Sequence, residues 1–162
     1  MSHSEWYVIG HQAAGMTDTP NLGIQSITWS DDPENPELPW GDYYPSLLIR
    51  QITLTVTASA IVAARRVKVE VFQAGGALLG ETTFWSRGTV GANQVRRFEF
   101  GLWALSTTLV TSPLGTQVQR ETLPDGLVLH PGGVLRTSLQ NFQVDDTYPS
   151  LTVQGTLLFD AP

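Results

Sequence analysis

The sequence predicts an all-β protein, an antiparallel β-sandwich of about eight strands with an extended N-terminal arm. The first observation is that apolar and polar residues alternate along most of the chain after residue 46, in runs separated by Gly, Pro, Asp or Asn. The second is that no stretch clearly repeats its apolar residues with the period of a helix. Only Leu102, Leu105 and Leu109 are also spaced for a helical face, and the β-branched residues around them favour a strand.

The length and composition suit one sandwich domain. A chain of 162 residues fits a single core. We expect residues 47–162 to form the sandwich, after an arm and an acidic, proline-rich loop at residues 1–46. Charged residues make up only 15% of the chain, against roughly 25% in an average soluble domain. The surface is therefore expected to be rich in uncharged polar residues.

Several classes of protein are disfavoured by the composition. A net charge of −6 argues against a nucleic-acid binder, which needs clustered Lys and Arg. The absence of cysteine excludes disulfides, thiol catalysis and cysteine zinc sites. No apolar run approaches the roughly 20 residues of a membrane span. The first residues lack a basic and apolar signal region, so we expect the protein to be made and kept in the cytosol unless lysis releases it.

The leading segment holds a short apolar run and an acidic run. Residues 6–9 are apolar, and we expect them to anchor an arm, residues 1 to about 22, that is ordered mainly by other chains. Residues 30–42 hold three prolines and five carboxylates, which predicts an extended loop. A calcium site is the alternative, but the alternating acids and central Gly of a helix-loop-helix site are missing. We therefore expect a solvated surface loop.

Aromatic residues in this leading segment are candidates for binding. Trp40, Tyr43 and Tyr44 have two interpretations, a stacking platform for a sugar and an anchor for the loop or for a protein interface. The anchor interpretation is favoured, because Trp and Tyr are also preferred interface anchors. The candidate interface residues are Trp6, Tyr7, Val8, Ile9, Trp40, Tyr43 and Tyr44.

The sandwich itself begins with a strand after Tyr44-Pro45, whose apolar face is Ile52, Leu54 and Val56. A strict alternation places Ile49 on the opposite face, with the threonines. Further runs predict strands at residues 67–71, 95–102, 134–141 and 151–159. The residues expected to be buried are Ile52, Leu54, Val56, Val67, Val69, Val71, Phe98, Phe100, Leu135, Leu139, Leu151, Val153 and Leu157.

Two turns precede the last strands. Pro124-Asp125-Gly126 fixes one φ and supplies a residue that tolerates positive φ, and Pro131-Gly132-Gly133 turns the chain again.

The outward strand faces are expected to favour self-association through a neutral surface. They could be desolvated without leaving many charged groups buried and unpaired. The residues on these faces include Thr53, Thr55, Thr57, Thr82 and Thr107.

No constellation in the sequence predicts catalysis, a cofactor or a metal site. The three histidines, His3, His11 and His130, lie in no ligand pattern, and a lone His130 disfavours a cupin-type enzyme. No Gly-Xaa-Ser-Xaa-Gly motif is present. The pairs Asp31-Asp32 and Asp145-Asp146 lie beside turn residues, and adjacent residues point apart, so turn chemistry explains them better than a glycosidase does. The basic pairs Arg65-Arg66 and Arg96-Arg97 are expected at solvated strand edges.

The segments Leu123–Leu127, Leu129–Leu135 and Leu151–Phe159 resemble parts of the small jelly-roll structural proteins of tailed-bacteriophage virions, as do the absent cysteines, low charge and long arm. The likeness is to decoration or cement proteins, which sit on capsid shells as trimers. It implies a jelly-roll sandwich without an active site, located in the virion and made in the host cytoplasm. The implied partners are the major capsid protein or another virion protein and further copies of the chain, with neither nucleic acid nor membrane. A carbohydrate-binding module, or a neck, tail or fibre component, stays the alternative.

Overall fold

The computed structural model describes the backbone of eight segments of the chain. The side chains are described in these segments except at residues 6–12, 24–28, 109–111 and 150. The eight segments are residues 6–12, 24–28, 46–73, 83–102, 109–111, 116–130, 133–147 and 150–158.

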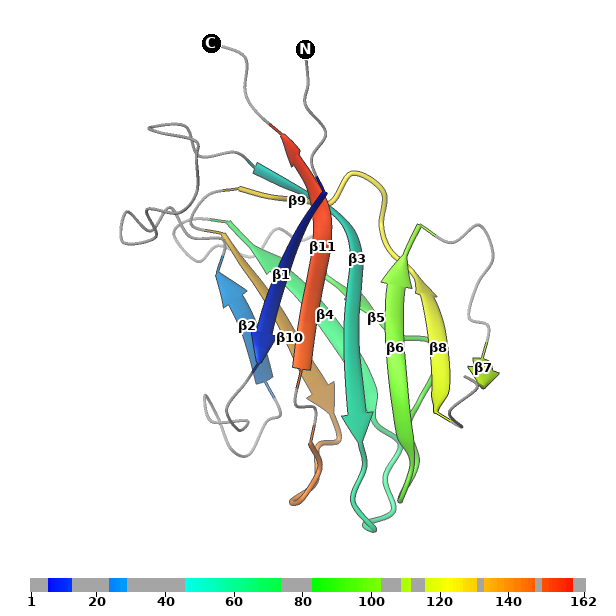
Figure 1. Ribbon diagram of the computed structural model, residues 1–162. Coiled ribbons are helices and arrows are strands. Elements are labelled where there is room, and N and C mark those ends of the chain that lie inside the picture. The colour runs from blue at the N-terminus through cyan, green and yellow to red at the C-terminus, as the bar shows by residue number, and fades with distance from the viewer. Residues whose placement is uncertain are drawn as a thin grey trace.

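These segments form two packed β-sheets (Figure 1). One sheet has the order β1-β11-β3-β6-β8-β7, with β9 also pairing β3, and the other has the order β2-β10-β4-β5. Every pairing is antiparallel except that of β6 with β8. The strands are β1 (Trp6–Gln12), β2 (Ile24–Thr28), β3 (Ser46–Thr57), β4 (Arg66–Phe72), β5 (Phe84–Trp85), β6 (Val95–Gly101), β7 (Leu109–Thr111), β8 (Gln117–Thr122), β9 (Val128–Leu129), β10 (Val134–Gln140) and β11 (Ser150–Leu158).

The predicted fold class is confirmed at the level of an all-β, two-sheet and mostly antiparallel protein. Eight strands have described side chains, five in the larger sheet (β3, β6, β8, β9, β11) and three in the smaller (β4, β5, β10), which agrees with the expected number. Around Leu109, where a helical face was the alternative, the described residues Leu109–Thr111 form a strand.

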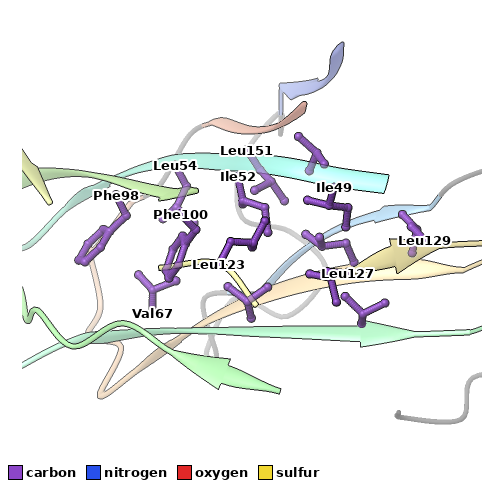
Figure 2. Packing of buried hydrophobic residues seen from close by; sticks show 14 of the residues in the cluster. Ile49, Ile52, Leu54, Val67, Phe98, Phe100, Leu123, Leu127, Leu129 and Leu151 are labelled. Atoms are coloured by element: carbon purple, nitrogen blue, oxygen red, sulfur yellow. The ribbon is translucent and has the colours of Figure 1, made fainter. Parts of the chain in front are cut away.

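The core lies between the two sheets, and the alternation of apolar residues predicts its members correctly. All thirteen residues expected to be buried are at most 4% exposed. Figure 2 shows Phe98 and Phe100 toward one end of this cluster and Ile49 and Leu129 toward the other. Burying a full side chain of this kind stabilises the fold by roughly 1.5–3 kcal/mol.

The turn after Leu123 also contributes to the core. Gly126 has a φ of 72°, the left-handed conformation that the Asp125-Gly126 sequence predicts. On either side of this turn Leu123 and Leu127 are buried, and the carbonyl of Leu127 accepts a hydrogen bond of 2.8 Å from the Ile49 amide. The turn therefore stabilises the first half of β3 through this hydrogen bond and also leads the chain into β9.

One prediction for β3 is wrong, because the strand contains a β-bulge. Ile49 was expected on the outward face, but it is 2% exposed. Gln51 pairs with Gln154 and Ile49 with Gly155, so Arg50 is left without a partner on β11. The extra residue reverses the alternation, and both halves of β3 direct apolar residues into the core.

Gly155 is required where β11 passes this bulge. A Cβ there would overlap the Leu48 carbonyl oxygen and lie 2.8 Å from Leu47 Cδ1. We expect Gly155→Ala to lower the free energy of unfolding by about 1–3 kcal/mol, measured by urea unfolding. Gly91→Ala is the matched control, because its nearest neighbour would be the flexible Gln94 side chain at 3.4 Å. Equal stability of the two variants would contradict the prediction.

The leading segment contributes one described strand to an edge of each sheet. β1 pairs with β11 and β2 pairs with β10. The remainder of residues 1–45 lies outside the described residues, including the acidic loop at residues 30–42. The division into an arm at 1–46 and a sandwich at 47–162, and the small contribution expected of the arm to subunit stability, stay predictions.

Candidate interaction surfaces

The seven candidate interface residues lie where the structure describes no side chains. The backbone of Trp6, Tyr7, Val8 and Ile9 belongs to β1, where these residues pair in order with Thr156, Gly155, Gln154 and Val153 of β11. Residues 40, 43 and 44 lie outside the described segments altogether. Their role at an interface stays a prediction.

Uncharged polar residues make up most of the outward face of the larger sheet over β3 and β11. Thr53 lies opposite Thr152, and Gln51 opposite Gln154. All four are half-buried, and the Gln51 amide donates to the Thr53 hydroxyl at 3.3 Å. Such a face can be covered without leaving a charge buried and unpaired.

Among the described residues, charges enter this face at the half-buried bulge residue Arg50 on β3 and where the face continues onto β6 and β8. The Glu99 carboxylate lies 3.1 Å from the Arg97 guanidinium and 3.6 Å from that of Arg120. Both arginine side chains are about half exposed, at 47% and 46%. Exposed pairs of this kind contribute little to stability. The face is therefore uncharged over the pairs Gln51–Gln154 and Thr53–Thr152, and charged at Arg50 and at its β6–β8 side.

The outward face of the smaller sheet is basic and aromatic, and sequence analysis missed it. The Trp85 side chain on β5 is 39% exposed. The Arg66 guanidinium lies 5.6 Å from the centre of its ring, and the Lys68 ammonium 5.4 Å, within the range of cation–π attraction. Arg66 also donates to the Ser86 carbonyl at 2.7 Å.

A buried carboxylate sits beside these cations. Glu70 accepts from Lys68 at 2.6 Å and from Arg136 at 2.9 Å, and its side chain is only 5% exposed. Burial by itself raises the pKa of Glu70, but the hydrogen bonds from Lys68 and Arg136 outweigh it and hold the pKa below its usual value. The Arg136 guanidinium also lies 4.4 Å from the centre of the Phe72 ring.

The charges on β4 could have been placed on one face from the sequence, because Arg66, Lys68 and Glu70 alternate with three valines. The contribution of Arg136 and Trp85 could not, since it depends on the pairing of β4 with β10 and β5. Together these side chains form a basic-aromatic face, which consists of Arg66, Lys68, Glu70, Trp85 and Arg136.

Arg65 corrects the expectation of a solvated pair at Arg65-Arg66. Its side chain is fully buried, and two of its nitrogens donate to the two oxygens of Asp146, each at 2.8 Å. The remaining donors reach the carbonyls of Ala63 and Ile61, both at 2.9 Å, and the Ser59 hydroxyl. Of the other basic residues in the two pairs, Arg66 and Arg96 are half-buried and Arg97 is exposed.

The partner carboxylate is equally well satisfied. Asp146 accepts from the backbone amides of Ser59 and Gln143, at 2.7 Å and 2.8 Å. Burial raises the pKa of Asp146, but the hydrogen bonds from Arg65 and from these amides outweigh it and hold the pKa below its usual value. Its neighbour Asp145 is exposed with a φ of 70°. Turn chemistry therefore explains Asp145, while Asp146 has a structural role that the sequence did not indicate.

The Arg65–Asp146 pair joins the loop after β3 to the loop before β11. Both loops lie at the lower end of the sandwich in Figure 1. Exposed apolar residues lie on these loops, with Ile61 42% exposed, Val62 91% and Val144 69%. The pair thus holds in place two loops that present apolar side chains to solvent.

The described polar groups suggest no catalytic centre. His130 is exposed, and its Nδ1 lies 2.8 Å from the Ser46 hydroxyl. Glu121 is buried and accepts from the amides of Arg87 and Gly88, at 2.9 Å and 2.8 Å, which is a structural role. No group of three or more His, Cys, Asp or Glu residues in the described segments could hold a metal ion. Nor do these segments contain a helix long and apolar enough to cross a membrane.

No protein-family model, curated protein or solved structure matches this chain. Function is therefore inferred from the fold, the two outward sheet faces and the resemblance described above.

Proposed function

We propose that the chain is a non-enzymatic virion structural protein, a capsid decoration or cement protein that self-associates and stabilises the capsid shell. Its partners would be the major capsid protein or another virion protein and further copies of itself, with a trimer as the expected oligomer. The observation that carries the proposal is the uncharged part of the outward face of β3 and β11, where Gln51 pairs with Gln154 and Thr53 with Thr152. Hydroxyls and amides on such a face find partners in another copy at little cost in desolvated charge.

The order of strand pairing supports the jelly-roll part of the proposal. β3 pairs with β11 in one sheet, and β4 pairs with β10 in the other. Early strands thus pair with late ones, as in a long antiparallel ribbon that rolls up on itself. The parallel pairing of β6 with β8 is a departure from such a ribbon.

The symmetry of a closed oligomer would raise its affinity for a capsid shell. A closed oligomer on a repeating protein lattice makes several contacts at once, and each contact raises the effective concentration of the next. Small and neutral contacts on each subunit then suffice for firm attachment.

Self-association through the neutral face is tested by analytical ultracentrifugation. We expect an oligomer at a protein concentration of about 50 µM, and Thr152→Lys is expected to dissociate it, because the new ammonium would be buried against a partner copy. Val62→Lys is the matched control, since Val62 is 91% exposed on a loop. Co-sedimentation with purified tailed-phage capsids then tests attachment.

The proposal is overturned by a monomer that fails to bind particles. A monomer of this kind that bound a glycan array would instead support the carbohydrate-binding alternative. Binding to tails or necks, without binding to shells, would place the protein elsewhere in the virion.

A further inference from the structure

The basic-aromatic face stands out because its charge is opposite to that of the whole chain. The chain carries a net charge of −6 and nine Lys and Arg residues. Three of those nine, Arg66, Lys68 and Arg136, lie on this one face, and among its described residues Glu70 is the one carboxylate. The four side chains together carry a charge of +2, three positive and one negative.

These cations are held in place before any partner arrives. Glu70 fixes Lys68 and Arg136, and the Ser86 carbonyl fixes Arg66. Lys68 and Arg136 nevertheless remain 26% and 37% exposed, so each can take a further anionic partner. Long side chains that are already ordered lose less conformational entropy on binding.

The exposed ring of Trp85 adds apolar area beside two of the cations, Arg66 and Lys68. Trp and Arg are enriched among the few residues that carry most of the energy of a protein interface. Because two cations already lie near the ring, a sugar stacked on the indole would compete with them for it. An anionic peptide would contact the ring and the cations together.

We propose that the basic-aromatic face docks the acidic segment, residues 31–42, of a second copy of this chain. The segment carries five carboxylates and no Lys, Arg or His, which complements the charge of the face. Its three prolines supply apolar rings that pack against an exposed indole. This contact does not depend on the proposed role in a virion.

A peptide of residues 30–42 tests the chemistry of the contact. Fluorescence anisotropy of the labelled peptide, titrated with the full chain, is expected to show binding that weakens as salt is raised. A peptide with Asn and Gln in place of its five carboxylates is expected not to bind. Lys68→Gln and Trp85→Ala are each expected to weaken binding at least about fivefold.

Arg97→Gln is the matched control variant. Arg97 also pairs with a carboxylate, Glu99, but it lies on the other sheet, away from exposed aromatic rings of the described residues. The Arg97→Gln variant should bind the peptide with the same affinity as the unchanged chain. The proposal is overturned if the peptide does not bind, if the neutral peptide binds equally well, or if Arg97→Gln weakens binding as much as Lys68→Gln.

A mixing experiment tests whether the contact joins two copies. One variant has the five carboxylates of the segment neutralised and keeps the face, and the other carries Lys68→Gln with Trp85→Ala and keeps the segment. We expect the tagged first variant to capture the second more strongly than either captures its own kind. Equal capture in all three combinations would overturn docking between copies.

Discussion

Replacing Asp146 by asparagine is expected to lower the free energy of unfolding by about 3–5 kcal/mol. The substitution keeps the shape of the side chain but leaves the fully buried guanidinium of Arg65 without its counter-charge. It also replaces an acceptor oxygen by an NH₂ group that faces other donors. Urea unfolding followed by tryptophan fluorescence measures the change, and a loss below about 1 kcal/mol would contradict the prediction.

Asp145→Asn is the control for this prediction. The two carboxylates are adjacent in sequence, but Asp145 is exposed and its left-handed backbone suits asparagine. The Asp145→Asn substitution should lower the free energy of unfolding by no more than about 0.5 kcal/mol. A double variant with apolar residues at 65 and 146 should recover only part of the loss, because no charge is then left unpaired but the amides of Ser59 and Gln143 lose their acceptor.

The effect of Asp146→Asn should also depend on pH. Because the folded protein holds the pKa of Asp146 below its usual value, the charged pair contributes its full stability above the unfolded pKa of about 3.9. That contribution is lost as the pH falls through the lower pKa of the folded protein. The difference in stability between the unchanged chain and Asp146→Asn should therefore shrink as the pH is lowered below about 4. A difference that grew in acid would contradict the assignment of this pair.

Replacing Phe100 by alanine is the second change expected to have a large effect. Phe100 is fully buried, with its ring 5.6 Å from that of Phe84 at an edge-on angle and 6.3 Å from that of Phe98. The substitution removes these contacts and leaves a cavity that the surrounding strands fill only in part. We expect the free energy of unfolding to fall by about 3–5 kcal/mol.

Urea unfolding measures this loss against Val95→Ala, on the same strand. Val95 is 45% exposed, so its truncation should cost less than about 0.5 kcal/mol. The dependence of the free energy on urea should be the same for both variants if the denatured state is unchanged. Equal stability of the two variants would mean that Phe100 does not belong to the packed core.

The inner faces of the strands could be predicted because alternation is a local property. Leu135 and Leu139 are each followed directly by a polar residue that faces outward, Arg136 and Gln140, and no knowledge of the partner strand is needed to place them. The Ile49 error shows the limit of this reasoning. A bulge is invisible in the alternation of one strand, because it is defined by the register with another.

The candidate surfaces were harder to predict, because they combine distant parts of the chain. Arg65 and Asp146 are 81 residues apart in sequence, and the basic-aromatic face needs residues from β4, β5 and β10. Single-strand patterns contain no information on such pairings. The aromatic residues proposed from sequence as interface anchors, Trp6 among them, stay predictions because their side chains are not described.

The bulge at Arg50 also limits how β3 and β11 can meet as the chain folds. A shift of one residue in the register of β3 against β11 would turn the apolar residues of one strand toward water, which is unfavourable by itself. A shift of two would keep that alternation but bring Val153 or Leu157 to the place where only Gly155 leaves room for the Leu48 carbonyl. Misaligned pairings of these two strands are therefore expected to dissociate, so that the strands can pair again in the native register, rather than persist as kinetic traps.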